Sequence, residues 1–127
     1  MTEPKDLPYT IRGRELIART DGLKVQILTL AAGEDIPWHS HTIIDDDFFC
    51  MEGPMIIETR RPEGAQQLKP GQTFKVPSGQ PHRVTGVVGG SCRFLLVQGV
   101  GEHDWVPEQR NWPGSFSVRD QVNQCSG

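Results

Sequence analysis

Short apolar segments separated by turn residues recur along most of this chain, and this rhythm constrains the fold more than any other feature. Segments bounded by Gly and Pro at intervals of about eight to twelve residues are typical of all-β sandwiches and barrels. No stretch places apolar residues at i, i+3, i+4 and i+7 over three turns, so we expect little helix. The strands expected are residues 24–31, 48–51, 55–59, 72–76, 82–88 and 92–100.

The length of the chain indicates one domain. A chain of 127 residues can bury roughly two-thirds of its unfolded surface around one core. Its 14 glycines and 10 prolines are spread along the chain rather than gathered in a linker, as short strands joined by turns require. We therefore expect a single domain over residues 1–127, with a strand or arm at 1–20 and an irregular arm at 102–127.

Charge and cysteine content exclude several classes of partner. The formal net charge of -3 provides no basic surface for nucleic acid. No apolar run approaches about 18 residues, and the polar N-terminus lacks a signal-peptide pattern. Cys50 and Cys92 lie in apolar segments and are expected in the core, while Cys125 lies on a tail and no CxxC pair is present. These features favour a cytoplasmic protein that binds neither nucleic acid nor membrane.

Two histidines one position apart point to a metal site. Side chains at i and i+2 of a strand share a face, so the imidazoles of His39 and His41 can converge on one point. An acidic run, residues 45–47, follows them, and His82 lies on a distant segment. Three imidazoles and one carboxylate suit a first-row transition ion.

The spacing of these residues resembles the two motifs of the cupins. The first motif of that family is Gly, five residues, His-x-His, three or four residues, Glu, six residues, Gly. The second is Gly, five residues, Pro-x-Gly, two residues, His, three residues, Asn. The residues at these positions here are Gly33, His39, His41, Asp46 and Gly53, then Gly71, Pro77, Gly79, His82 and Gly86. The resemblance covers residues 33–86 and implies a cupin-type antiparallel β-barrel, also called a double-stranded β-helix or jelly roll.

Two positions depart from the family pattern. The Glu of the first motif is an Asp here, and Gly86 replaces the Asn that closes the second. Counting selects Asp46, because Asp45 stands too far from the closing glycine and Asp47 too far from His41. The shorter side chain leaves open whether this carboxylate binds the ion directly, through water, or not at all.

The resemblance implies one divalent transition ion. The implied ligands are His39, His41, Asp46 and His82. Imidazoles suit iron, manganese, nickel, zinc and copper alike, so the donor set does not select the metal.

Strand alternation predicts the neighbours of the site. If Asp46 faces inward, so do Phe48 and Cys50, and His82 brings Val84 and Gly86 with it. In the strand at 55–59 either face could point inward. Inward-facing Glu58 and Arg60 would supply an acid or base and a carboxylate-binding group. We favour the alternative, in which both charges face solvent and protect the strand.

Three residues outside the motifs have simpler interpretations. His103 stands between Glu102 and Asp104 and is expected at the surface. Trp105 and Trp112 are expected to pack on the barrel, with a subunit contact or a pocket cover as the alternatives.

Two classes of function fit this pattern. The resemblance implies a metal-dependent enzyme on a small organic molecule, with dioxygenase the leading subclass before isomerase and lyase, and catalytic residues unassigned. The alternative is a non-catalytic module that binds or senses a small ligand or metal. Metal-free sugar epimerases of related barrels use a histidine and a tyrosine, and Tyr9 is the sole tyrosine here, which disfavours them. The resemblance also implies a homodimer paired through edge strands.

Overall fold

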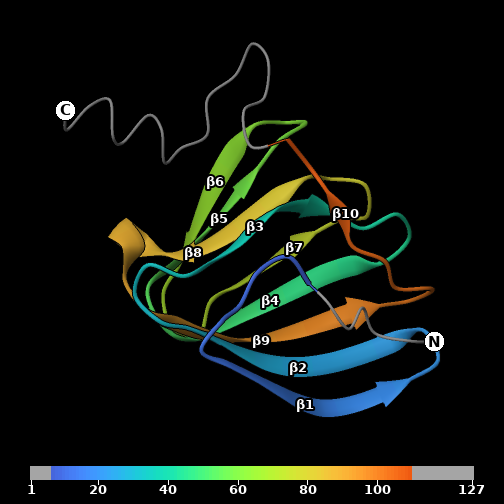
Figure 1. Cartoon of the computed structure of the whole chain (residues 1–127), viewed down its shortest axis with the longest axis horizontal. Helices are drawn as coiled ribbons and strands as arrows, with labels where there is room; N and C mark the ends of the chain where they lie inside the picture. Colours follow the sequence, from blue (N-terminus) through green and yellow to red (C-terminus); the bar gives the residue numbers. More distant parts are fainter. Residues whose placement is uncertain (1–6, 110–127) are drawn as a thin grey trace.

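Two five-stranded antiparallel sheets face each other in the computed structural model, which describes residues 7–109 (Figure 1). The first sheet has the order β1 (Gly13–Thr20), β2 (Leu23–Leu30), β9 (Cys92–Gly99), β4 (Asp45–Glu52), β7 (Thr73–Val76). The second has the order β10 (Val106–Pro107), β3 (Asp35–Ser40), β8 (His82–Gly86), β5 (Met55–Thr59), β6 (Gly64–Leu68). From β2 to β10 the chain crosses between the sheets at each connection except the β5–β6 hairpin. This is the predicted jelly-roll barrel.

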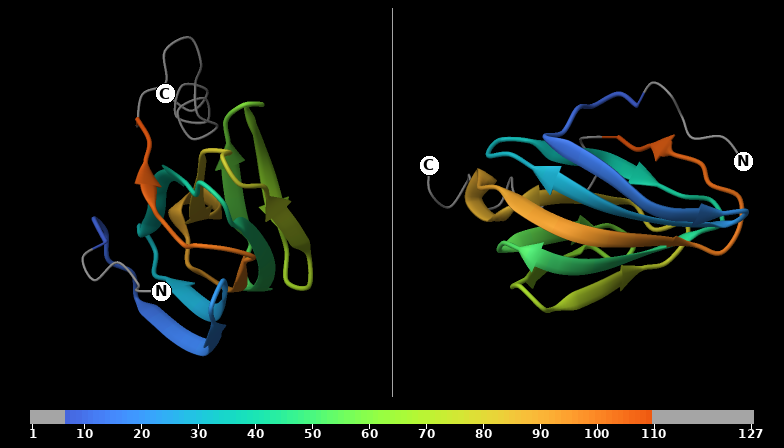
Figure 2. Two further views of the ribbon diagram at one scale, coloured as in Figure 1. Left: turned by 90° about the vertical axis from the view of Figure 1, so that its right-hand side faces the viewer. Right: turned by 90° about the horizontal axis from the view of Figure 1, so that it is seen from below.

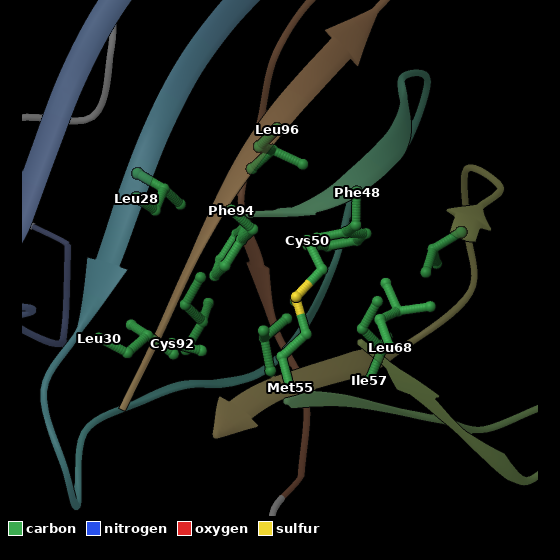
Figure 3. Close-up of a cluster of buried hydrophobic side chains, with 13 residues drawn as sticks. Leu28, Leu30, Phe48, Cys50, Met55, Ile57, Leu68, Cys92, Phe94 and Leu96 are labelled. Carbon is green, nitrogen blue, oxygen red and sulfur yellow. The ribbon is translucent and has the colours of Figure 1, made fainter. Parts of the chain in front are cut away.

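The sheets enclose an apolar core that fills one part of the barrel. In β2 and β9 every second residue is buried, as expected for strands with one face on a core. Phe48, Cys50 and Val84 point inward, which confirms the prediction from alternation, and Cys92 is buried with them. Figure 3 shows side chains from both sheets pointing toward one another in this core. The predicted positions of Cys125 and Trp112 lie outside the described residues.

The segment before β1 and the segment around β10 lie on the same side of the barrel in both views of Figure 2. Side chains of the two segments meet there, since the ring centroids of Tyr9 and Trp105 are 5.8 Å apart. The two ends of the described chain therefore close the same side of the fold.

The strand predicted at 82–88 is shorter in the structure, because β8 ends at Gly86 and Val87–Gly89 form a 3₁₀ turn. The reason is a close approach of the backbone. A Cβ on Gly86 would lie 1.8 Å from the carbonyl oxygen of Gly90, so the chain can fold back here only where residue 86 has no side chain.

Strand β6 was not among the predicted strands. Its sequence, Gly-Ala-Gln-Gln-Leu, buries only Leu68, at the end. A polar edge strand carries no apolar alternation, so its signal is weak. Among residues 7–109, no helix is long and apolar enough to cross a membrane.

Candidate metal centre

Strand register brings the four predicted ligands together. His39 of β3 and His82 of β8 are direct cross-strand partners in one sheet. Asp46 of β4 faces them from the other sheet, and His41 follows the end of β3. All four side chains are buried, and their candidate ligand atoms lie within 4.8 Å of one another. That is the scale of one coordination shell, whose bonds to a transition ion are about 2.0–2.2 Å long.

The three imidazole rings are held by backbone carbonyl oxygens. The pairs are His39 Nδ1 with Pro37 O at 2.7 Å, His41 Nδ1 with Asp104 O at 2.5 Å, and His82 Nδ1 with Gln80 O at 3.0 Å. Because a carbonyl oxygen only accepts, each Nδ1 must carry the hydrogen. A neutral ring in this tautomer has its lone pair on Nε2, which is how protein environments orient histidine toward a metal.

The Asp46 carboxylate lies against two of these nitrogens. Its Oδ2 is 3.1 Å from His41 Nε2 and 3.0 Å from His82 Nε2. With Nδ1 protonated, Nε2 and the carboxylate oxygen are both acceptors. Two acceptors attract each other only through a positive charge between them. That charge is either a proton on Nε2 of the ring or a metal cation. Because the Nε2 lone pairs and the carboxylate oxygen face one another, these residues fit a divalent transition ion.

The pKa values of the cluster follow from burial and mutual charge. Burial, together with the nearby His82 and His41, holds the pKa of His39 well below its ordinary value. For His41, burial lowers the pKa, but the hydrogen bond and charge of Asp46 outweigh it and raise the pKa overall. Burial acts to raise the pKa of Asp46, yet its hydrogen bonds with His41 and His82 hold it far below its usual range. The carboxylate is thus ionised, and it favours the charged form of His41.

A chain of side-chain hydrogen bonds ends on Asp46. Gln98 Nε2 donates to Asp46 Oδ1 at 2.9 Å, and Gln26 Nε2 donates to Gln98 Oε1 at 3.1 Å. Arg14 Nη1 donates to Gln26 Oε1 at 3.4 Å. The guanidinium has only donors, so it fixes the direction of both amides. Oδ1 is thereby engaged, and Oδ2 remains directed at the histidines.

A pocket of about 540 Å³ opens on the cluster, with His39, His41 and Asp46 in its wall. Trp105 also lines this pocket and stacks on His39, with ring centroids 4.9 Å apart and planes 12° apart. It therefore packs on the barrel, as favoured, and forms part of the pocket wall.

The prediction for His103 was wrong. Its side chain is half-buried in the pocket wall rather than on the open surface, and its Nε2 donates to the carbonyl oxygen of Gln98 at 3.2 Å. Sequence reasoning missed this because the residue follows the last long strand, where no alternation indicates direction.

The favoured interpretation of Glu58 and Arg60 was also wrong, since the two residues are 1% and 2% exposed. They lie on the face of the second sheet opposite the core and are not among the residues that line the pocket. Glu58 Oε2 accepts a hydrogen bond from Arg83 Nη1 at 3.0 Å, and the Arg60 guanidinium stacks 3.8 Å from the Trp38 ring centroid. The cross-strand partner Arg83 allows Glu58 to be buried, and the Trp38 ring covers the guanidinium of Arg60. The role of acid or base at the metal centre is not supported.

The other two aspartates of the acidic run point away from the cluster. Asp45 Oδ1 accepts a hydrogen bond from the backbone of Ser78, and Lys75 lies 3.8 Å from Asp47 and 4.0 Å from Asp45. The count that selected Asp46 therefore agrees with the geometry.

Several polar residues of the pocket were not predicted. Lys24 and Gln26 of β2 and Gln98 of β9 stand at buried positions, in the same inward-facing register as Leu28 and Phe94 of the core. The signal was available: a polar residue in the inward register of an apolar strand indicates a lined cavity rather than packed core.

Fold and site together define a small jelly-roll barrel with a buried cluster of three histidines and one aspartate. A family model described as cupin domain matches residues 26–98. This is more than half of the chain, which therefore belongs to the cupin family. A search of curated proteins finds no match.

Solved structures share the fold at low sequence identity. An uncharacterised conserved protein with a double-stranded β-helix domain from Klebsiella pneumoniae is 19% identical, with a TM-score of 0.66 over 84% of this chain and 100% of the other. TT1209 from Thermus thermophilus is 20% identical, with a TM-score of 0.63 over 80% and 100%. KdgF from Halomonas is 18% identical, with a TM-score of 0.60 over 70% and 78%. These likenesses establish the fold alone.

Proposed function

We propose that this chain is a metal-dependent cupin enzyme that acts on a small organic molecule. The proposed ligands of one divalent transition ion are His39, His41, Asp46 and His82. The observation that carries the proposal is the arrangement of acceptors: carbonyl oxygens fix Nδ1–H on each ring, so Nε2 lone pairs face a buried carboxylate oxygen. An ion there would supply Lewis acidity toward a substrate oxygen or, where iron, manganese or copper is bound, redox chemistry with dioxygen.

The residues around the cluster suit catalysis on a bound molecule. Because three of the four ligands line the pocket, a molecule in the pocket would lie beside the ion. Nε2 of His103 donates to a carbonyl, so the neutral ring carries its lone pair on Nδ1. Burial and the charge of Lys24 lower the pKa of His103, which keeps the ring neutral at neutral pH. Since His103 lines the pocket, we propose that it exchanges a proton with a molecule bound there.

The identity of the ion decides between subclasses. Dioxygenase remains the leading subclass and is expected if the purified protein holds iron, manganese or copper. Zinc or nickel would favour isomerase or lyase chemistry, which needs no change of oxidation state. Elemental analysis of the protein as purified separates these outcomes.

Substitution of two ligands tests the metal centre. His39→Ala and His82→Ala are expected to lose most bound metal while keeping the circular dichroism of a folded barrel. His103→Ala, which removes an imidazole from the same pocket but not from the cluster, is the matched control and is expected to keep its metal. Full metal content in both ligand variants would refute the site.

Turnover tests the enzymatic half of the proposal. Protein loaded with Fe(II), Mn(II), Ni(II) or Zn(II) is incubated with diketones, phenols, thiols and uronates, and products are followed by mass spectrometry. Tight binding without turnover across the panel would favour the binding or sensor module instead. The homodimer and the cytoplasmic location stay predictions, and light scattering after gel filtration tests the dimer.

A further inference from the structure

The pocket beside the metal centre contains two cationic side chains at different depths. Lys24 is 7% exposed, in the inward register of β2, opposite Gln98 of β9. Arg14 is exposed on β1 and lines the same pocket. Arg14 is held in place by its hydrogen bonds to Gln26 Oε1 at 3.4 Å and to Tyr9 Oη at 3.0 Å. These bonds use two of the five donors of a guanidinium.

The carboxylates of the pocket are already engaged. Asp46 contacts two histidines and Gln98. Asp104 accepts hydrogen bonds from the backbone N–H of Thr42, at 2.8 Å, and from its hydroxyl. Among the described residues that line the pocket, the formal charges of Lys24 and Arg14 balance those of Asp46 and Asp104. A bound divalent ion would therefore leave an excess of positive charge among these groups, although the chain as a whole carries -3. A low-dielectric cavity of this kind concentrates the field and favours an anion.

A third group in the wall can donate to an oxygen. The indole Nε1 of Trp105 is buried and, within residues 7–109, is the side-chain polar atom that lacks a hydrogen-bond partner. An indole N–H only donates, and leaving it unsatisfied in a buried place is unfavourable. An acceptor atom of a bound molecule would satisfy it.

We propose that the pocket binds a small organic carboxylate, whose anionic group contacts Lys24 and Arg14 while a second oxygen faces the metal centre. This inference rests on the metal centre proposed above. Part of the wall is apolar, with Leu28, Ile36, Phe48, Val84 and Leu96, and this part suits the hydrocarbon portion of the ligand. The 540 Å³ of space suits a molecule of about the size of a substituted benzoate, within the usual range of ligand pockets.

A matched pair of probes isolates the anionic group. Zinc-loaded protein is titrated calorimetrically with 3,4-dihydroxybenzoate and with 3,4-dihydroxybenzamide. Both carry the same catechol oxygens for the metal, and only the first carries a charge at the far end. The wild type is expected to bind the acid at least about tenfold more tightly, as a charge-assisted hydrogen bond implies.

Variants then locate the contact. Lys24→Met is expected to remove most of the preference for the acid while leaving the affinity for the amide unchanged. Lys24→Arg keeps the charge and is expected to retain the preference, which separates loss of charge from loss of fold. Lys75→Met removes a lysine of the outer face, beside Asp45 and Asp47, and is the control expected to behave as wild type.

The outcomes distinguish the two proposals. Equal affinity of the zinc-loaded wild type for acid and amide, no binding of either at millimolar concentration, or a preference that survives Lys24→Met would overturn the carboxylate site. Zinc content is measured on the same samples. Wild-type protein that retains no zinc would overturn the proposed function instead.

Discussion

Gln98 and Asp46 are cross-strand partners on β9 and β4, and the Gln98 amide donates to Asp46 Oδ1 at 2.9 Å. The contact leaves Oδ2 as the carboxylate oxygen directed at the histidines. We therefore expect Gln98 to act as a positioning residue for the proposed metal centre, through Asp46.

Gln98→Leu should weaken metal binding without removing a ligand. Loss of an outer partner of a ligand typically costs about 10–100-fold in affinity. Zinc affinity is measured by competition with a chelator, and Gln66→Leu on the exposed part of β6 is the control. Unchanged zinc affinity in Gln98→Leu would show that the hydrogen bond from Gln98 is not needed to orient the Asp46 carboxylate.

Asp46→Asn should reduce zinc affinity by at least as much, because the neutral amide loses the charge that balances the ion. Asp45→Asn and Asp47→Asn remove a charge from the same acidic run but from the outer face, near Lys75. Both are expected to keep wild-type affinity in the same competition assay. Equal effects from all three variants would show that the run acts only through its total charge.

Metal uptake should release a proton near neutral pH. Asp46 raises the pKa of His41 above its ordinary 6.5, so the folded metal-free protein holds a proton there that the ion must displace. His39, whose pKa is lowered, contributes none. The number of protons released should fall and the apparent affinity should rise as the pH increases past the raised pKa. Calorimetry in buffers of different ionisation enthalpy at pH 6.5 and 8.5 measures this, and equal proton counts at both would contradict it.

The core should depend on Phe94. Its side chain is fully buried, with its ring centroid 5.6 Å from that of Phe48. Phe94→Ala should lower the free energy of unfolding by about 3–5 kcal/mol. Phe49→Ala, at 38% exposure on the outer face of β4, should cost much less. Urea denaturation compares the pair, and similar midpoints would contradict the assigned core.

Gly86→Ala should also destabilise the barrel, because the added Cβ would lie 1.8 Å from Gly90 O. The backbone must shift, at a cost of about 1–3 kcal/mol, as for other overpacked sites. Gly13→Ala is the control, since its Cβ would meet its nearest neighbour at 3.5 Å. Equal melting temperatures for the two variants would show that the backbone of residues 87–90 can shift at little cost in free energy.

Motif spacing predicted the fold and the clustering of four side chains because both depend on strand register. His39 and His82 meet through direct cross-strand pairing, and alternation correctly turned Phe48 and Val84 inward. Such relations repeat along a strand and can be counted in a sequence.

Other features depend on contacts that no count reveals. Glu58 is buried because Arg83 of the neighbouring strand pairs with it, and Trp105 reaches His39 through an irregular segment. Only the folded chain places these groups side by side.

The cupin match spans residues 26–98. These bounds separate the proposed metal ligands from four of the other residues that line the pocket. All four proposed ligands lie inside the matched span, whereas Arg14, Lys24, His103 and Trp105 lie outside. Relatives aligned only over the matched span therefore inform on the proposed metal centre, and not on the groups that we expect to contact a substrate. A truncated chain that contained only residues 26–98 would lack the groups that we expect to determine substrate selectivity.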